Sequence, residues 1–599
     1  MITSEDIKRR LWNGANDLRG SMDASRYKDY MLGLLFYKFL SDKTLETFRQ
    51  VSGMKEASEK EIIEEYTKAI DLNGNSVTNM LQKVLGYYVQ PKYLYQQWIS
   101  DIDNGCFEVQ KVTDSLNDFE RTIDGSNDSD DFKGLFSNST LDLSDTALGA
   151  DLKTRNNNIK QLIQLFADLN MADLQKGDIL GDAYEYLIGM FAMESGKKAG
   201  EFYTPRQVSE VMAQIVAKSS KIESIYDAAV GSGSLLLTVS KHLDKEAQKN
   251  LNYYGQEKNT ATYNLTRMNL LLHGVRPDRM TIRNADTLGQ DWPEDPSRPS
   301  EGVQFDAVVM NPPYSLKKWN KEGIKASDPR FEFVGVLPPD SKGDYAFLLH
   351  GLYHLGQKGT MAIVLPHGVL FRGSAEGEIR KRLVDKNYLD AVIGLPSNLF
   401  TNTSIPVTVI ILKKDRGLKD PVLIIDASNG FIKSGKTNQL QEKDIAKIVD
   451  AYVNKTEEFG YSHLASLQEI SKNDYNLNIP RYVDSYNVDI PQDVNAHLFG
   501  GIPNENIKSL KILQEVVPDV LKDSFKEIRP GYSELLVTPE ELSKNVLGSK
   551  QVIKVEDNIK KDVDNYIDKY WRVLRNPESK IVSSLKEEMC TFVNDVKHK

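Results

Sequence analysis

The four residues Asn311-Pro-Pro-Tyr314 form the motif with the most specific chemistry in this sequence. They follow a strongly apolar run, residues 305–310, which predicts a buried β-strand that ends where the motif begins. Pro312 and Pro313 remove backbone donors and stiffen the turn, so the Asn311 side-chain oxygen and the Pro312 carbonyl can point at one target. Both groups are acceptors, and together they can hold the two hydrogens of a planar amino group. The motif therefore predicts a site that orients such a group.

Holding both hydrogens would turn the nitrogen lone pair toward a sulfonium methyl group, which is positioning of a nucleophile and needs no general base. Proximity and orientation supply roughly 7 to 11 kcal/mol in the best intramolecular reactions. Tyr314 would stack on the base that carries the amino group, and a base in a duplex must first be flipped out of the helix. A proline-rich turn that only closes a strand is the structural alternative.

A second motif, upstream of the first, predicts a turn that binds a cofactor. The sequence 227–234 follows a predicted strand and precedes a predicted helix, and its two glycines let the backbone approach a ligand closely. Leu236 stands where a dinucleotide fingerprint has its third glycine, so a tight turn without a ligand is an alternative. The candidate cofactor-binding residues of this turn are Asp227, Gly231, Ser232, Gly233 and Ser234.

Two acidic residues follow the glycine turn in the sequence. Glu257 ends the second strand and could accept hydrogen bonds from both hydroxyls of a ribose. Asp286 could lie beside the exocyclic amine of an adenine, and an exposed, solvated acid is the alternative there. The spacing of these residues after the glycine turn favours a nucleoside-containing cofactor.

The elements that must position these residues alternate between helices and short β-rich runs. This alternation predicts an α/β fold, a Rossmann-like domain with a mostly parallel sheet, between residues 161 and 443. Residues 1–160 read as a helical domain with a polar linker, and residues 30–40 as its buried helix. Residues 444–599 read as a charged helical region. A chain of 599 residues is long enough for these three domains.

Taken together, the motifs resemble those of amino-methyltransferases of the gamma motif order, and residues 18–43 and 426–429 resemble the modification subunits of type I restriction-modification systems. The resemblance implies methylation of adenine in double-stranded DNA with S-adenosylmethionine, in an Asn311–Tyr314 pocket. This chain departs from the family's common turn at Ala228, Val230 and Ser234. The resemblance adds a further segment to the expected cofactor contacts, comprising Gly200, Glu201, Phe202, Tyr203, Thr204 and Pro205. Phe202 and Tyr203 could instead be core aromatics.

The same resemblance implies partners: a specificity subunit with target recognition domains, two modification subunits for each specificity subunit, and a restriction subunit. A net charge of −10 agrees with a partner that supplies many of the basic contacts with DNA phosphates. We predict a contact face for a partner helix in the C-terminal region, with packing on the protein's own core as the alternative. This face is formed by Ile559, Val563, Tyr566 and Tyr570.

The cysteine content, the hydropathy and one phosphate-loop-like motif bear on whether the chain has disulfides, a metal site, a membrane span or an ATP site. Cys106 and Cys590 are the only cysteines, so we expect no disulfide framework, no metal site and a reducing, cytoplasmic location. No run of eighteen apolar residues predicts a membrane span. Residues 430–437 match the phosphate-loop pattern, but the next helical pattern begins near Glu442, so we expect no ATP site. Methylation of a protein glutamine or a cytosine amino group, or a non-catalytic assembly subunit, are the alternative functions.

Overall fold

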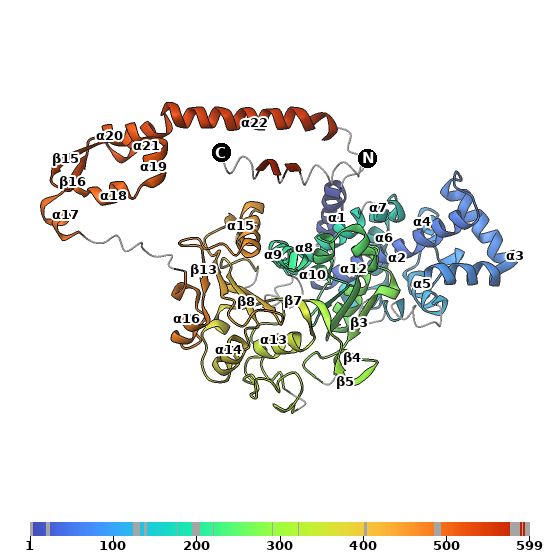
Figure 1. Cartoon of the computed structure of the whole chain (residues 1–599). Helices are drawn as coiled ribbons and strands as arrows, with labels where there is room; N and C mark the ends of the chain where they lie inside the picture. Colours follow the sequence, from blue (N-terminus) through green and yellow to red (C-terminus); the bar gives the residue numbers. More distant parts are fainter. Residues whose placement is uncertain are drawn as a thin grey trace. The chain divides into compact units, whose positions relative to one another are not determined.

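The computed structural model describes most of the chain and divides it into two compact units, residues 1–486 and residues 487–599 (Figure 1). The described residues are 4–18, 24–123, 132–136, 141–176, 178–194, 204–219, 221–289, 291–320, 323–400, 404–435, 437–483, 493–574, 588–589 and 591–593. Within this part, no helix is long and apolar enough to cross a bilayer.

A nine-stranded sheet forms the centre of the first unit, in the order β3-β2-β1-β6-β7-β9-β8-β10-β13. Most neighbours are parallel, whereas β9 is antiparallel to β7 and β8, and β13 is antiparallel to β10. The sheet confirms the predicted α/β fold, and its strand β6 coincides with the apolar run at residues 305–310 that the sequence marked as a strand. Its strands are β1 (Ser224–Asp227), β2 (Asn252–Glu257), β3 (Met280–Asn284), β6 (Phe305–Met310), β7 (Leu355–Pro366), β8 (Leu389–Gly394), β9 (Val407–Lys413), β10 (Val422–Asp426) and β13 (Ser462–Ala465).

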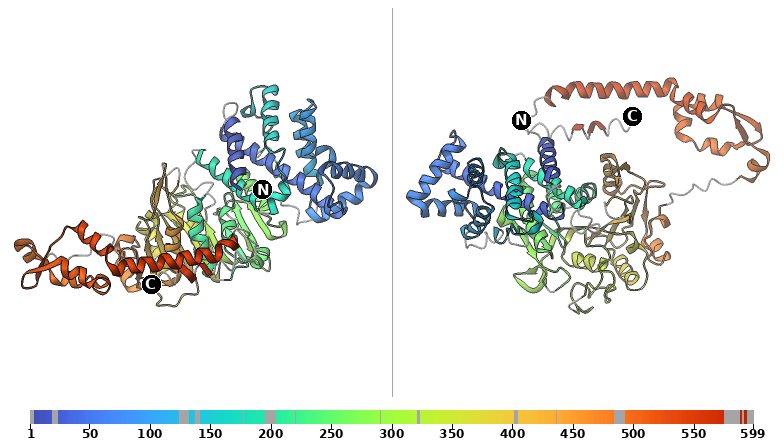
Figure 2. Two further views of the ribbon diagram at one scale, coloured as in Figure 1. Left: turned by 90° about the horizontal axis from the view of Figure 1, so that it is seen from above. Right: turned by 180° about the vertical axis from the view of Figure 1, so that it is seen from behind.

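The strand side chains alternate between two cores, one on each face of the sheet. Ala307 and Val309 of β6 belong to one apolar cluster, and Val308 and Met310 belong to the other. Helices cover both faces, as the two views of Figure 2 show. The helices of this part of the first unit are α8 (Ile179–Glu194), α9 (Arg206–Ser219), α10 (Ser234–Lys241), α11 (Lys245–Asn250), α12 (Thr260–Leu272), α13 (Asp344–Tyr353), α14 (Ala375–Asp385), α15 (Glu442–Asn454) and α16 (Leu467–Lys472).

The N-terminal part of the first unit is helical, as predicted, and residues 30–40 lie in its most buried helix, α2. Side chains of α12 tie this part to the sheet: Arg267 donates to the Lys133 carbonyl and Asn264 to the Gly134 carbonyl, both at 2.9 Å. The helices are α1 (Ser4–Leu18), α2 (Ala24–Val51), α3 (Glu59–Leu85), α4 (Tyr95–Asp103), α5 (Val109–Thr122), α6 (Leu152–Phe166) and α7 (Met171–Lys176).

The first unit extends to residue 486, past the boundary predicted at residue 444. The reason is that β13 pairs with β10 at the edge of the sheet, with Val422 opposite Ala465. Two short hairpins also belong to this unit. They consist of β4 (Glu294–Asp295) with β5 (Arg298–Gly302), and β11 (Ile432–Ser434) with β12 (Thr437–Gln439).

The second unit is mainly helical and also contains a small antiparallel sheet that the sequence did not predict. Gly531, with φ of 82°, permits the tight turn between β15 and β16. The elements are α17 (Val494–Phe499), β14 (Ile502–Pro503), α18 (Asn504–Lys508), α19 (Lys511–Val516), α20 (Pro518–Ser524), β15 (Phe525–Arg529), β16 (Tyr532–Leu535), α21 (Pro539–Leu547) and α22 (Lys550–Leu574).

Candidate active site

The carboxyl ends of β1, β2, β3 and β6 meet at one edge of the sheet because these neighbouring strands are parallel. A cavity of about 290 Å³ opens there. Parallel sheets of this kind bind ligands outside the carboxyl ends of their strands. Four of the residues predicted from the sequence line this one cavity: Glu257, Asp286, Asn311 and Pro313.

The glycine turn after β1 lies beside the cavity and is held from behind by α12. Gly231 and Gly233 have φ of 56° and 80°, values that favour glycine. The Thr266 hydroxyl donates to the Gly231 carbonyl, and the Asn269 amide donates to the Ser232 carbonyl at 2.9 Å. A Cβ added at Gly233 would lie 3.1 Å from the Thr266 methyl carbon. The backbone of the turn is therefore fixed without any ligand.

Asp227 ends β1 and is buried at the start of this turn. Burial, with a smaller contribution from nearby Glu257, raises the pKa of its carboxyl to about 8, although the Ala229 N–H, which donates to Asp227 Oδ1 at 2.9 Å, opposes this rise. At neutral pH the unliganded carboxyl is mostly protonated. A cationic group bound beside it would favour the ionised form.

The two predicted acids lie on adjacent strand ends. Asn284 at the end of β3 donates to the Glu257 carbonyl at 2.8 Å, which joins the ends of β3 and β2. Glu257 Oε1 accepts the Asn259 N–H at 2.8 Å. Asp286 is partly exposed but not simply solvated, because it forms an ion pair with Lys258. Lys258 lines the same cavity and competes with any amine for this carboxylate.

Asn311 and Tyr314, the first and last residues of the predicted catalytic motif, contact each other. The buried Asn311 donates through Nδ2 to the Thr204 hydroxyl at 3.1 Å, and its Oδ1 accepts the Tyr314 hydroxyl at 2.8 Å. The Tyr314 ring packs edge-on against Phe400, with centroids 5.8 Å apart. Burial raises the pKa of Tyr314 well above its usual value, so the hydroxyl keeps its proton. The acceptor expected to hold a substrate amino group is thus already engaged.

Of the predicted segment at residues 200–205, the structure describes only Thr204 and Pro205. The Thr204 hydroxyl accepts the Asn311 hydrogen bond described above, and the Pro205 carbonyl accepts the first N–H bonds of α9. Gly200, Glu201, Phe202 and Tyr203 lie outside the described residues, as does Cys590.

The sequence analysis missed Phe347, which lines the cavity from α13 and is almost buried. An aromatic ring there offers a flat apolar wall to a nucleoside base. Its sequence context is a continuous apolar helix, which is typical of a core residue. The one available signal is that this helix directly follows the loop after the Asn311–Tyr314 motif.

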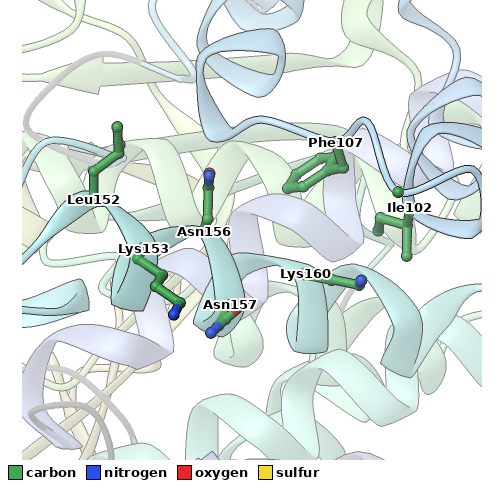
Figure 3. Close-up of a pocket in the computed structure, with 8 residues that line it drawn as sticks. Ile102, Phe107, Leu152, Lys153, Asn156, Asn157 and Lys160 are labelled. Atoms are coloured by element: carbon green, nitrogen blue, oxygen red, sulfur yellow. The ribbon is translucent and has the colours of Figure 1, made fainter.

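Two further cavities adjoin other parts of the first unit. One of about 190 Å³ is lined by Thr204 and Ser234 together with charged residues of α8, α9 and α10. Another of about 420 Å³ lies among the N-terminal helices, where Lys153, Asn156 and Lys160 project from α6 near Phe107 (Figure 3). The latter contains none of the predicted site residues.

The segment that matches the phosphate-loop pattern is a β-hairpin. Its two strands, β11 and β12, pair with Ile432 opposite Gln439, and the next helix, α15, begins only at Glu442. No helix starts at Thr437, so the N–H groups that would cradle phosphates are missing at that residue. The absence of ATP binding stays a prediction, and it rests on this missing start of a helix. The hairpin instead braces the loop before Phe400, since Asn438 donates to the Ser397 carbonyl at 2.8 Å.

Comparison with known proteins identifies the family. Residues 175–489 match the N-6 DNA methylase family model, and residues 7–166 match the model of the HsdM N-terminal domain. The chain is 37% identical over 530 residues to the type I restriction enzyme MpnII methylase subunit of Mycoplasma pneumoniae, which covers 86% of this chain and 96% of that protein. It is 28% identical over 559 residues to the MjaIX methylase subunit of Methanocaldococcus jannaschii, covering 87% of this chain and 91% of that one.

A solved structure agrees with these sequence relationships. The crystal structure of a type I restriction-modification methyltransferase subunit from Streptococcus thermophilus superposes with a TM-score of 0.74 at 44% identity. The match covers 81% of this chain and all of that one. This chain therefore belongs to the N-6 adenine DNA methyltransferases, as a methylase subunit of the type I restriction-modification family.

Proposed function

We propose that this chain transfers a methyl group from S-adenosylmethionine to the exocyclic amino group of adenine in double-stranded DNA. The observation that carries this proposal is the shared cavity, which is lined by Glu257 and Asp286 on one side and by Asn311 and Pro313 on the other. Residues suited to a nucleoside and residues suited to a planar amino group thus face one space. When bound, S-adenosylmethionine supplies an activated methyl group there.

The residues present fit this cofactor. Glu257 would accept the ribose hydroxyls, Asp286 would accept the adenine amine, and Phe347 would pack on the base. The Asp227 carboxyl, whose pKa is raised, would ionise beside a positively charged group of the cofactor. The Gly231–Gly233 turn lets the backbone approach the ligand closely.

On the substrate side, Asn311 Oδ1 and the Pro312 carbonyl would accept the two hydrogens of the target amino group. The base reaches them only after it flips out of the duplex. Tyr314 would then turn from its edge-on contact with Phe400 to stack on the base, and its hydrogen bond to Asn311 would be replaced. Exchange of one such hydrogen bond involves about 1 kcal/mol, which is small beside the few kcal/mol of base flipping.

For partners, we propose a specificity subunit that reads the DNA sequence, two copies of this chain on each specificity subunit, and a restriction subunit, all in the cytoplasm, where modification protects host DNA. The net charge of −10 supports a shared grip on DNA. On α22, Tyr570 of the predicted contact face is buried within this chain, with its ring centroid 4.6 Å from that of Tyr566. On the same helix, Ile553 and Ile567 are 44% and 48% exposed, and these apolar side chains support a contact with a partner subunit.

The test is to incubate the chain, with and without its specificity subunit, with unmodified DNA and labelled S-adenosylmethionine, and to digest the DNA to nucleosides. We expect labelled methyladenine only with the partner present, and none with Asn311→Ala. Label in cytosine or in protein glutamine would overturn the substrate. Binding of cofactor without any transfer would instead support an assembly subunit.

A further inference from the structure

Directly after the catalytic motif, the chain turns through Ser315 in a left-handed conformation, with φ of 52°. A residue other than glycine keeps such a conformation only where its surroundings hold it. Two contacts join this turn to the start of α13. The Ser315 N–H donates to Asp344 Oδ1 at 2.7 Å, and the Gly343 N–H donates to the Leu316 carbonyl at 2.9 Å. The turn beside Tyr314 is therefore clamped to the helix that also carries Phe347.

Asp344 is the first residue of α13 and is completely buried. Its second oxygen, Oδ2, accepts a hydrogen bond from the Arg372 guanidinium at 2.7 Å. Arg372 in turn forms an ion pair with the buried Glu376, with 2.9 Å between Nε and Oε2. Arg372 lies just beyond the end of β7, so the Asp344 carboxylate links the segments that follow the adjacent strands β6 and β7.

A second buried carboxylate shows what is particular to this arrangement. Asp390 also pairs with an arginine, Arg416, with 2.9 Å between Oδ1 and Nε, and it accepts further bonds from Tyr452 and Lys455. Each of these donors is a side chain, and Asp390 lies at the amino end of β8. Asp344 instead accepts a bond from the backbone N–H of the residue that follows Tyr314.

We propose that Asp344 is a positioning residue for methyl transfer. It fixes the Ser315 turn, and through that turn it sets the direction in which Asn311 and Tyr314 face the substrate amino group. Arg372 holds the carboxylate in the orientation that receives the Ser315 N–H. This inference rests on the proposed function, because its rate readout requires transfer to DNA. A positioning role differs from a purely structural role because substitution of Asp344 should lower the rate of methyl transfer and leave the affinity for the cofactor unchanged.

The first experiment measures single-turnover methyl transfer to genomic DNA from a host that lacks the system, with the chain assembled on its specificity subunit. We expect Asp344→Ala to slow transfer by about 30- to 100-fold, because displacement of reacting groups by about 1 Å has an effect of this size. The affinity for S-adenosylmethionine should stay at the wild-type value. Asp344→Asn keeps an oxygen acceptor for Ser315 and should stay within about tenfold of the wild-type rate.

The second experiment measures amide hydrogen exchange of the peptide that contains residues 311–320. Asp344→Ala should speed exchange in this peptide and leave distant peptides unchanged, since it removes the acceptor of the Ser315 N–H. Asp344→Asn should leave exchange slow. Asp390→Ala is the matched control, because it removes a buried carboxylate paired with an arginine; it should lower thermal stability without changing the transfer rate or this peptide.

A folded Asp344→Ala protein that transfers methyl at the rate of Asp390→Ala, or with unchanged exchange in residues 311–320, would overturn the inference. If Asp344→Ala does not fold, Asp344→Asn decides: a loss beyond about 100-fold with intact cofactor binding contradicts the role as acceptor. A wild-type protein that transfers no methyl to DNA would refute the proposed function. The exchange experiment would still report on the clamp itself, so the two failures are distinguishable.

Discussion

The two walls of the active-site cavity are built in different ways. On the proposed cofactor side, the glycine turn is held by hydrogen bonds from α12 to its own carbonyls, so its shape does not depend on a ligand. On the proposed substrate side, Asn311 and Tyr314 bond to each other, and under the proposed function their groups must be released before a base can bind. From this difference we predict a preformed cofactor wall and a substrate wall that rearranges on binding.

Asn311→Ala should have the largest effect and should separate the two walls most clearly. We expect methyl transfer to fall on the order of 10²–10³-fold, because loss of one positioned hydrogen-bonding group at a reacting centre costs roughly this much. Affinity for S-adenosylmethionine, measured by calorimetry, should change little. A comparable loss of cofactor affinity would show that the walls are not independent.

The pH dependence of cofactor binding tests the preformed wall at Asp227. The pKa of its carboxyl is about 8 without ligand, and a bound cation lowers it, so binding releases a proton below pH 8. Affinity should therefore rise with pH, by up to about tenfold per unit, and level off above pH 8. Calorimetry in buffers of different ionisation enthalpy counts the proton. In Asp227→Asn the dependence of cofactor affinity on pH should vanish. A pH dependence that persists in this variant would mean that another group releases the proton.

Gly233→Ala should loosen the same wall. The left-handed conformation costs a residue other than glycine roughly 1–2 kcal/mol, and here the added Cβ also crowds Thr266. We expect lower unfolding free energy in urea and about tenfold weaker cofactor binding, the equivalent of 1.4 kcal/mol. Gly274→Ala is the matched control, since Gly274 also has φ of 80° but no atom within 4 Å. It should lose stability and keep cofactor affinity.

Tyr314→Phe should have the smallest effect and should ease the rearrangement of the substrate wall. The variant keeps the ring for stacking but frees Asn311 Oδ1 from the hydroxyl. Since a hydrogen bond of this kind contributes about 1 kcal/mol, KM for DNA should fall by up to about fivefold with kcat nearly unchanged. Steady-state kinetics on DNA would show this. A higher KM would mean that the hydroxyl binds substrate.

Local patterns predicted much of the framework. The strongly apolar run at residues 305–310 located β6, and the motif at its end placed Asn311 at the carboxyl edge of a mostly parallel sheet. The continuous apolar run at residues 30–40 marked a buried helix. Glu257 and Asp286 were expected near one ligand, and they do line one cavity. The predictions of the strand and the helix succeeded because strand and helix patterns are properties of neighbouring residues, whereas binding of a ligand by Glu257 and Asp286 stays a prediction.

The sequence by itself determined the α/β framework and the residue types at the edge of the sheet where we propose catalysis. Only the tertiary structure decided how their side chains pair: Asn311 with Thr204, 107 residues away, and the Ser315 turn with Asp344. It also decided that Phe347 faces the cavity and that Lys258 neutralises Asp286. Such contacts join segments that are distant in the chain. They depend on strand order and helix packing, which residue periodicity does not encode.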